Sequence, residues 1–344
     1  MSYERGIAAI RLQDPGEIPH TQYTCHEPWL AALRQRAGKP NADFAELLNF
    51  DLLWHTDTPD GTGGRWTDMG HATWLADGSD YHPPAGSPFV SLDDIFDLDP
   101  ATEYRPVDHA AQVERYQAWY DRARRADCVV PGGLYRSAVS WAIAAFGWEN
   151  FLLAVGTDAE RFGGLMNRWA DYLMAYVRAW AATDIEVFLT HDDIVWTAGG
   201  FLPPAFYRAF VFPNLKRYWD CVKDAGKTVL FCSDGNFTEY VDDLAAAGAD
   251  GFIFEPTTDL AAIVRRYGQT HVIVGNADCR VLTGPPDGIE REVARCMDLG
   301  RDCPGYFFAV GNHIPPDVPI ESADACIAAY RALRARQPTG GPTD

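Results

Sequence analysis

Short runs of β-branched and aromatic residues alternate with longer amphipathic stretches from residue 128 onward. The strand-like runs lie at residues 128–131, 186–190, 228–232, 251–254, 272–274 and 306–310. The helical patterns lie at residues 158–182, 204–225, 238–247, 259–267, 287–299 and 321–336. Each helical stretch is long enough to connect two parallel strands. The pattern therefore predicts repeated strand-helix units and a parallel sheet.

Two more strand-like runs precede these, at residues 18–23 and 52–56, with helical segments at 28–36 and 42–48. Eight strands alternating with helices are typical of a closed (β/α)8 barrel, the TIM barrel, rather than of an open sheet. We therefore predict an α/β fold with one barrel domain over residues 1–344. Residues 337–344 are rich in proline and glycine and are expected to be a frayed tail.

The interval 59–127 does not fit the alternation, because it is rich in glycine, aspartate, proline and tryptophan. We interpret it as an insertion after the second strand. An insertion at the carboxyl end of a barrel strand lies over the mouth, so this segment is expected to act as a lid.

Composition narrows the class of protein. Hydrophobic residues make up 47% of the chain, enough for a large core, and the net charge of −19 argues against a nucleic-acid partner. No secretion signal or membrane-spanning segment is evident, and the eight cysteines form no CxxC pair, so reduced thiols and a cytoplasmic location are expected.

The expected active site lies where the barrel strands end. Seven of the eight predicted strand ends carry His, Asp, Glu, Cys or Asn. The polar residues at these strand ends, which also include Gln22, are His20, Gln22, His55, Asp57, His191, Asp192, Asp193, Cys232, Asp234, Glu255, Asn276, Asp278, Asn312 and His313. The alternative is that such loops are polar in any case and that Asp and Asn cap the next helix.

Cys232 and Asp234 are two residues apart on one strand, so they share a face, and Gly235 allows a tight turn after them. A thiolate, a carboxylate and an imidazole from His313 or His191 suit zinc with an open position for substrate. The alternative places Cys232 in the packed core and gives Asp234 the role of ordering the loop.

Asp192, Asp193 and Asp278 offer general acid or base groups. Their alternative role is a helix cap or a salt bridge with Arg280 or Arg136. Both arginines are equally suited to hold a substrate carboxylate. The chain has no P-loop, GxSxG elbow, HExxH helix or helix-opening GxGxxG, which disfavours nucleotide binding and serine hydrolysis.

Four polar segments follow one another along the chain. They are His191-Asp192-Asp193 with Phe201-Leu202-Pro203-Pro204, Cys232-Ser233-Asp234-Gly235-Asn236, Gly275-Asn276-Ala277-Asp278 and Gly311-Asn312-His313-Ile314-Pro315-Pro316. In this order they resemble the uroporphyrinogen decarboxylase superfamily, and the resemblance covers most of the chain, from about residue 147 to residue 336. The segment Ile18-Pro19-His20-Thr21-Gln22-Tyr23 resembles the first strand of divergent members. The resemblance implies a (β/α)8 barrel.

The resemblance implies two chemistries. Uroporphyrinogen decarboxylases act without a cofactor on a tetrapyrrole polyacid, and their relatives use zinc to move methyl groups to or from a separate corrinoid protein. The Arg-Gln-Ala-Gly-Arg-type segment of the decarboxylases has no match here. The methyltransferases carry His-x-Cys where this chain has Cys232-Ser233-Asp234, and a later Cys near Asn312, so this chain offers an oxygen-richer site.

We therefore predict a metal-assisted methyltransferase or demethylase with a corrinoid-carrying partner protein and a small-molecule substrate. The alternatives are a cofactor-free decarboxylase of a carboxylated aromatic or pyrrolic substrate, and a non-catalytic binding subunit. A homodimer is a further expectation. The assigned residues are His191, Asp193, Asp278 and Glu255 for catalysis, His20, Gln22, His55, Asn276, Arg280 and Arg136 for substrate, and Cys232, Asp234 and His313 for zinc.

Overall fold

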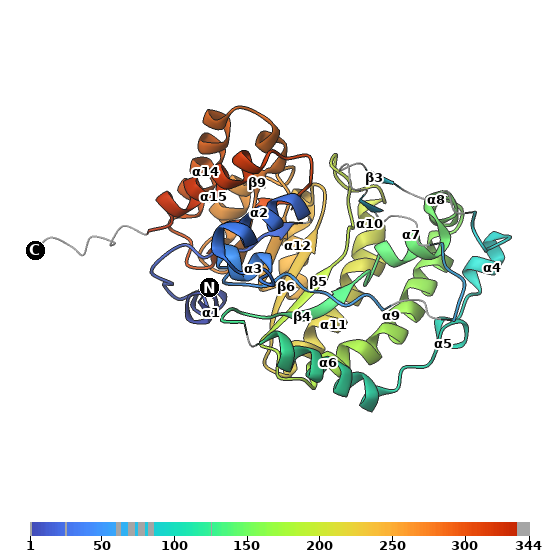
Figure 1. The fold of residues 1–344 in the computed structure, drawn as a ribbon. Coiled ribbons are helices and arrows are strands. Elements are labelled where there is room, and N and C mark those ends of the chain that lie inside the picture. The colour runs from blue at the N-terminus through green and yellow to red at the C-terminus, as the bar shows by residue number, and fades with distance from the viewer. Residues whose placement is uncertain are drawn as a thin grey trace, which may run out of the picture. The chain divides into compact units, whose positions relative to one another are not determined.

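The computed structural model describes residues 2–24, 26–59, 63–67, 73–74, 80–81, 86–124 and 126–335 (Figure 1). The chain divides into two compact units: residues 1–54, 126–129 and 253–344 form the first, and residues 55–125 and 130–252 form the second. Strand β7 (Gly251–Phe254) crosses the boundary between them. No helix in the described ranges is long and apolar enough to cross a membrane.

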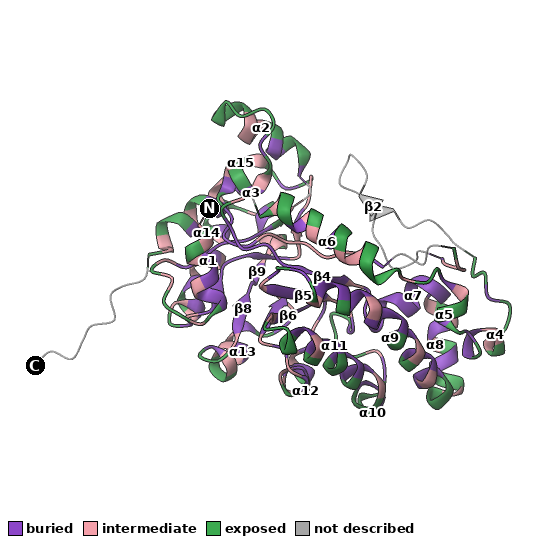
Figure 2. Ribbon diagram, turned by 90° about the horizontal axis from the view of Figure 1, so that it is seen from below, coloured by how far each residue is buried: buried purple, intermediate pink, exposed green. Residues whose placement is uncertain are grey.

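Three parallel strands form the sheet of the second unit. They are β4 (Gly132–Tyr135), β5 (Val187–His191) and β6 (Thr228–Ser233), and they are coloured as largely buried in Figure 2. The last two match predicted strands. The first, β4, lies later in the chain than the predicted strand 128–131. It begins with two glycines, and glycine is uncommon in strands, so the sequence pattern did not mark these residues as a strand. A Cβ on Gly133 would lie 1.8 Å from the carbonyl oxygen of Leu189, so this strand pair requires glycine.

Helix α9 (Ala159–Ala181) is the longest described helix of the second unit. Asp158 caps its first turn by accepting a hydrogen bond from the Arg161 amide at 3.0 Å. A buried apolar stripe packs α9 against α6 (His109–Ala123) and α11 (Phe212–Asp224). The other helical segments are α4 (Leu92–Phe96), α5 (Pro100–Glu103), α7 (Ser140–Phe146), α8 (Trp148–Thr157), α10 (Pro204–Phe206), η1 (Tyr207–Val211), η2 (Thr238–Tyr240) and α12 (Val241–Ala247).

The predicted insertion, residues 59–127, contains regular structure. It holds the antiparallel hairpin of β2 (Thr73–Trp74) and β3 (Asp80–Tyr81) as well as α4, α5 and α6. Since α5 and α6 pack against α9, this part of the segment belongs to the body of the second unit. A lid role for the segment stays a prediction, as does the single barrel domain over residues 1–344.

The first unit contains three parallel strand pairs. They are β1 (Tyr23–Thr24) with β12 (His313–Ile314), β8 (Val272–Val274) with β10 (Tyr306–Phe307), and β9 (Ala277–Asp278) with β11 (Val310–Gly311). The predicted run 306–310 is thus split between two strands. The helical segments are α1 (Tyr3–Ile10), α2 (Glu27–Ala37), α3 (Phe44–Leu48), α13 (Leu260–Tyr267), η3 (Cys279–Thr283), α14 (Pro286–Gly300) and α15 (Ile320–Leu333).

The two N-terminal strand predictions are matched only in small part. Of the predicted strand 18–23, only its last residue lies in β1, and His20 adds an isolated parallel bridge to Phe308. The predicted strand 52–56 has no regular strand, and isolated parallel bridges mark Leu52 and Asp57. The predicted frayed tail, 337–344, lies outside the described residues.

Candidate functional site

The ends of three parallel strands bring polar side chains together in the second unit. Strand β5 ends at His191, and the register pairs this residue with Tyr135 of β4 and with Cys232 of β6. Asp193 and Asp234 follow two residues after His191 and Cys232. Because parallel strands end at the same edge of the sheet, these five residues share one site.

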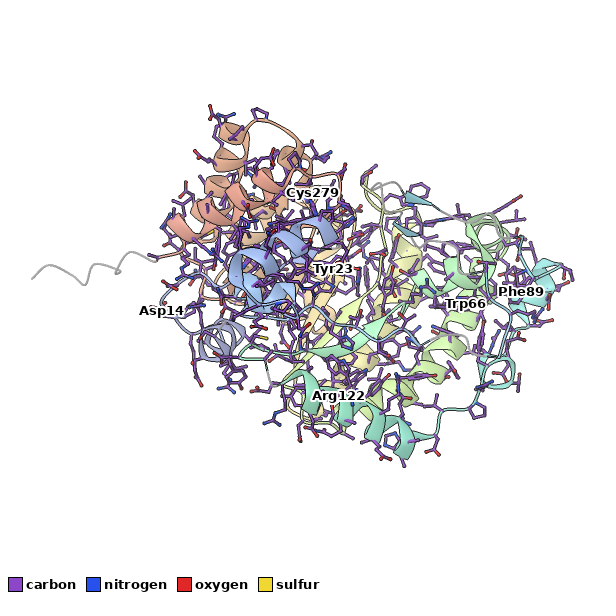
Figure 3. All side chains as sticks on the ribbon, viewed as in Figure 1. Asp14, Tyr23, Trp66, Phe89, Arg122 and Cys279 are labelled. Carbon is purple, nitrogen blue, oxygen red and sulfur yellow. The ribbon has the colours of Figure 1, made fainter. Side chains whose placement is uncertain are left out.

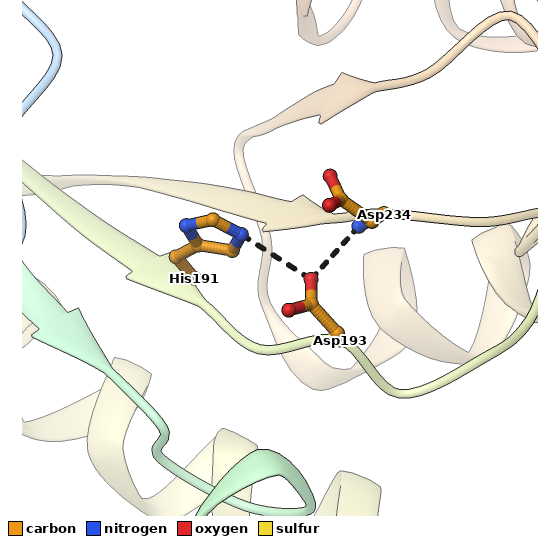
Figure 4. Close-up of side chains that lie close together, drawn as sticks. All are labelled: His191, Asp193 and Asp234. Carbon is orange, nitrogen blue, oxygen red and sulfur yellow. Dashed lines mark hydrogen bonds and ion pairs between the residues drawn. The ribbon is translucent and has the colours of Figure 1, made fainter. Parts of the chain in front are cut away.

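Asp193 lies at the centre of this site (Figure 4). Its Oδ1 lies 3.2 Å from His191 Nε2 and accepts a hydrogen bond from the Asp234 amide at 3.0 Å. Its Oδ2 accepts a hydrogen bond from the Tyr135 hydroxyl at 3.1 Å. The side chains of His191 and Asp193 are 19% and 28% exposed, so solvent screens this ion pair less than a fully exposed one.

Burial and neighbouring groups shift the pKa values of the residues in this site. Burial lowers the pKa of His191, but the neighbouring Cys232 and Asp193 outweigh it, so that this pKa lies well above its usual value. Burial raises the pKa of Asp193, but His191 and the hydrogen-bond donors lower it by more than burial raises it. The pKa of Asp193 therefore lies below its usual value. Burial raises the pKa of the Cys232 thiol to about 11 despite its hydrogen bond with His191. Asp193 is therefore an ionised carboxylate.

Asp192 has a structural role that sets it apart from Asp193. It is fully buried, and its carboxylate accepts hydrogen bonds from the amides of Val139 (2.9 Å), Ser140 (3.0 Å) and Ala138 and from the hydroxyls of Ser137 (3.0 Å) and Ser140 (3.2 Å). Burial raises the pKa of Asp192, and the backbone donors oppose that rise. The carboxylate thus fixes the turn that leads into α7.

A pocket of about 70 Å³ opens beside Asp193 within the second unit. It is lined by Tyr135, Arg136, Ser140, Ile143, Trp148, Asp193, Val195, Trp196 and Phe201. A cavity of about 150 Å³ holds a benzene molecule, so this pocket admits a substituent of a few heavy atoms rather than a whole ring system. Arg136, only 4% exposed, is the cation among these lining residues.

An aromatic wall forms one side of the pocket. The ring centroids of Trp148, Trp196 and Phe201 lie 5.2–5.5 Å apart, a distance typical of packed aromatic rings. The guanidinium of Arg136 lies 5.7 Å from the ring centroid of Tyr135 and 5.6 Å from that of Trp66, which Figure 3 labels. The pocket therefore combines an apolar wall with one buried cation and one carboxylate.

In the described part of the chain, one group of three side chains has the geometry of a metal site. Donor atoms of His191, Asp193 and Asp234 all lie within 4.8 Å of one another. One imidazole and two carboxylates are a donor set that zinc accepts, with an open position for substrate. Cys232, a predicted ligand, is buried, and its thiol hydrogen-bonds the His191 ring. His313, the other predicted ligand, belongs to the first unit.

His20 and Gln22, which we predicted to bind substrate, lie in the core of the first unit. His20 is 1% exposed and its ring stacks on Tyr330 at a centroid distance of 4.7 Å. The Gln22 amide donates to His20 Nε2 at 3.2 Å, while its oxygen accepts from the Val310 amide at 2.9 Å. Burial lowers the pKa of His20 to about 3, so the ring is neutral. Both residues are placed as packing residues.

Two further predicted substrate residues are engaged within their own units. His55 stacks on Trp119 with centroids 3.7 Å apart, and burial lowers its pKa to about 4. Asn276 is buried and donates its amide to the carbonyl oxygens of Thr258 (2.9 Å) and Glu255 (3.2 Å). These contacts give the two side chains defined structural roles.

Asp278 and Arg280 pair with each other. Asp278 Oδ2 lies 2.7 Å from Arg280 Nη2, and Asp278 Oδ1 accepts from the Arg280 amide at 2.9 Å, which caps η3. The hydrogen bond from Arg280 lowers the pKa of Asp278, and the Arg280 side chain is 75% exposed. The helix cap and salt bridge that the sequence left open as alternatives are therefore both present.

Sequence analysis missed the aromatic wall. Trp148 opens α8, whereas Trp196 and Phe201 lie in the loop after β5. The available signal was the density of aromatic residues directly after His191-Asp192-Asp193. It was not decisive, because aromatic residues more often pack in the core than line a pocket.

Comparison with known proteins places the chain in a family. The family model described as Uroporphyrinogen decarboxylase (URO-D) matches residues 69–333. The uroporphyrinogen decarboxylase of Xanthomonas euvesicatoria pv. vesicatoria is 32% identical over 180 residues, 50% of this chain and 50% of that protein. That of Syntrophotalea carbinolica is 32% identical over 164 residues, 48% of this chain and 46% of that protein. The chain thus spans about half the length of the curated relatives it matches.

A solved structure of a methyltransferase from Methanosarcina mazei aligns with a TM-score of 0.66 and 16% identity, over 96% of this chain and 99% of that chain. At this identity the likeness concerns the fold. The predicted α/β fold with the parallel strands of a (β/α)8 barrel is confirmed. Because the family model matches most of the sequence, the chain belongs to the uroporphyrinogen decarboxylase family.

Proposed function

We propose that the chain is a metal-assisted methyltransferase that takes a methyl group from a small substrate carrying a carboxylate. The single observation that supports this proposal most is the group formed by His191, Asp193 and Asp234, whose donor atoms lie within 4.8 Å of one another. Asp193 also lines the pocket, so a cation bound by this group would adjoin the substrate. A divalent cation held there, most simply zinc, would supply Lewis-acid stabilisation of the leaving heteroatom.

The residues around the pocket position the substrate. Arg136 is suited to pair with the substrate carboxylate, because a buried guanidinium binds a carboxylate through two parallel hydrogen bonds. The aromatic wall of Trp148, Trp196 and Phe201 contacts the methyl-bearing part and excludes water from it. The Tyr135 hydroxyl, which donates to Asp193, holds that carboxylate in place.

In the transfer itself, the methyl carbon bonds to the nucleophilic acceptor while its bond to the substrate heteroatom breaks. The electron pair of the broken bond stays on the heteroatom. The acceptor we propose is a reduced corrinoid on a separate protein, as the family resemblance implies.

Metal analysis of the purified protein tests the cation site. We expect near-stoichiometric zinc after reconstitution, and at least a tenfold weaker zinc affinity in Asp193→Asn and in Asp234→Asn. Asp243→Asn is the matched control, because Asp243 pairs with Arg208 on the surface at 3.0 Å. Equal zinc affinity in all four proteins would refute the site.

A methyl-transfer assay tests the reaction, with free cob(I)alamin as acceptor and a panel of small methoxy- and methylamino-carboxylic acids as donors. We expect methylcobalamin to form with wild-type protein, and Arg136→Met to raise KM at least tenfold with a smaller change in kcat. Loss of kcat at unchanged KM would contradict a binding role for Arg136.

Decarboxylation is the second candidate, favoured by the presence of both Arg136 and Asp193 in the lining of one pocket and by the names of the curated relatives. The bond from the carboxyl carbon breaks, its electron pair stays on the substrate carbon, and carbon dioxide leaves. Ionised Asp193 is suited to stabilise positive charge that develops on the substrate before that step. Carbon dioxide release that persists in chelator would favour this function over methyl transfer.

A further inference from the structure

The backbone that carries Asp193 lies beyond the end of a strand of the sheet. Strand β5 ends at His191, and the Asp192 amide still donates to the Cys232 carbonyl oxygen of β6 at 2.9 Å. Figure 4 shows Asp193 in the loop that follows the strand. The amides of Asp193 and Ile194 therefore need partners other than a neighbouring strand, because an N–H group that folding removes from water is costly unless it is hydrogen-bonded.

Two serine hydroxyls supply these partners. Ser140 Oγ accepts a hydrogen bond from the Asp193 amide at 2.8 Å, and Ser233 Oγ accepts one from the Ile194 amide at 3.2 Å. Ser140 begins α7 and Ser233 ends β6, so the hydroxyls come from two different elements of the second unit. The peptide groups on both sides of the Asp193 Cα atom are held in this way.

Each hydroxyl is itself oriented by a second hydrogen bond. Ser140 Oγ donates to the carboxylate of Asp192 at 3.2 Å, and Ser233 Oγ donates to the carbonyl oxygen of Asp234 at 2.8 Å. A hydroxyl group has one hydrogen, so its oxygen lone pairs are left for the amides of the loop. Both serines are buried, and packing limits the rotamers that they can adopt.

The carboxylate of Asp193 is also held through its own oxygens. An aspartate side chain is short, so the position of its backbone largely decides where the two oxygens lie. The Asp234 amide then donates to Oδ1, and the Tyr135 hydroxyl donates to Oδ2. Because each carboxylate oxygen has more than one lone pair, both oxygens can still accept a cation.

We propose that Ser140 and Ser233 are positioning residues that fix the Asp193 carboxylate in the geometry that binds the cation. This role rests on the proposed function, in which His191, Asp193 and Asp234 form the cation site. Zinc prefers a tetrahedral set of ligands, whereas calcium accepts a larger and more variable set of oxygens. A backbone that is held on both sides of Asp193 therefore favours zinc over calcium at this site.

Amide hydrogen exchange of the ¹⁵N-labelled protein, followed by NMR, tests the two hydrogen bonds in the absence of any cation. We expect the Asp193 amide to exchange about tenfold faster in Ser140→Ala than in the wild type. The Ile194 amide should exchange faster by a similar factor in Ser233→Ala, because each variant removes the oxygen that accepts the amide.

Ser91→Ala is the matched control, because it also removes a hydroxyl that accepts a backbone amide. Ser91 Oγ accepts from the Asp94 amide at 3.1 Å, where it caps α4. We expect wild-type exchange at both loop amides in this control. Wild-type exchange in the two test variants as well would overturn the inference.

Zinc binding separates a positioning role from a merely structural one. Competition with a chelating dye should show about tenfold weaker zinc affinity in Ser140→Ala and in Ser233→Ala, and wild-type affinity in Ser91→Ala, since groups that orient a metal ligand typically have an effect of this size. The preference for zinc over calcium should fall in the same two variants. Ser140→Thr keeps the hydroxyl and should restore the zinc affinity, because its added methyl group adjoins the pocket that Ser140 lines.

The outcomes distinguish this role from the cation site itself. Equal zinc affinity in the wild type, Ser140→Ala and Ser233→Ala would overturn the positioning role and leave the cation site in place. A wild-type protein that binds no zinc would refute the cation site and the positioning role together. Failure of the proposed methyl transfer is recognised separately, by the absence of methylcobalamin with a wild-type protein that binds zinc.

Discussion

Replacing Asp192 by asparagine should destabilise the second unit more than any replacement of a surface carboxylate. The buried carboxylate accepts five hydrogen bonds from residues 137–140. Asparagine keeps one acceptor oxygen. Its NH₂ group takes the place of the other oxygen and faces the N–H and O–H donors of residues 137–140. If the amide nitrogen takes the Oδ2 position, the buried Ala138 N–H loses its partner, which costs about 1–3 kcal/mol.

The bonds to the remaining oxygen also weaken, by about 1 kcal/mol each, because the acceptor is no longer charged. Burying the Asp192 charge is itself unfavourable, as its raised pKa shows, so removing the charge offsets part of this loss. We expect a net loss of about 2–4 kcal/mol in the free energy of unfolding.

Urea denaturation at neutral pH, followed by circular dichroism, measures this loss. Asp220→Asn is the control, because Asp220 pairs with Lys216 at an exposed i,i+4 position, and we expect a change of at most about 0.5 kcal/mol there. If Asp192→Asn is no less stable than Asp220→Asn, the carboxylate does not hold the turn before α7, and the account of this turn is wrong.

Two further predictions follow from burial and backbone geometry. In the wild-type protein the pKa of His20 falls to about 3 on folding, so between pH 6.5 and 5 only the unfolded chain binds a proton at this residue, and stability falls with pH. His20→Phe should remove about 2 kcal/mol of this loss. Urea denaturation midpoints measure the stability at each pH. His109→Gln, on the exposed surface of α6, is the matched control. Parallel slopes of stability against pH in His20→Phe and wild type would count against the buried neutral ring. Gly235→Ala should cost about 2 kcal/mol or more in thermal unfolding, because Gly235 has a φ of +81° and a Cβ would lie 2.7 Å from the Trp196 carbonyl oxygen; an unchanged melting temperature would contradict this.

Part of the site could be predicted from the sequence because strands are recognisable from local patterns of residues. The runs 186–190 and 228–232 are recognisable as strands, and the residues that follow them must lie at the same edge of a parallel sheet. This reasoning correctly placed His191, Asp193 and Asp234 near one another. It could not separate Asp192 from Asp193, because that difference depends on a turn at residues 137–140 that is remote in the sequence.

The remaining predicted residues show the limit of this reasoning. The sequence of a histidine near a strand end is the same whether its side chain contacts a ligand or packs against a ring in the core. His20 packs among aromatic side chains, and Asp278 pairs with Arg280 two residues away. Only the partners that folding supplies distinguish these cases.

The sequence by itself determined the α/β class, the order of the strand-helix units and the strand ends where polar side chains gather, because hydrophobic periodicity and turn residues are local properties of the chain. Tertiary structure decided which of those side chains meet. The hydrogen bond from the Asp234 amide to Asp193, the pocket lined by both Trp148 and Arg136, and the hydrogen bond from Asn312 to Glu255 all join residues whose distance depends on the packing of whole elements. Burial then set their charges, since a carboxylate or an imidazole takes its pKa from the neighbours that packing places around it.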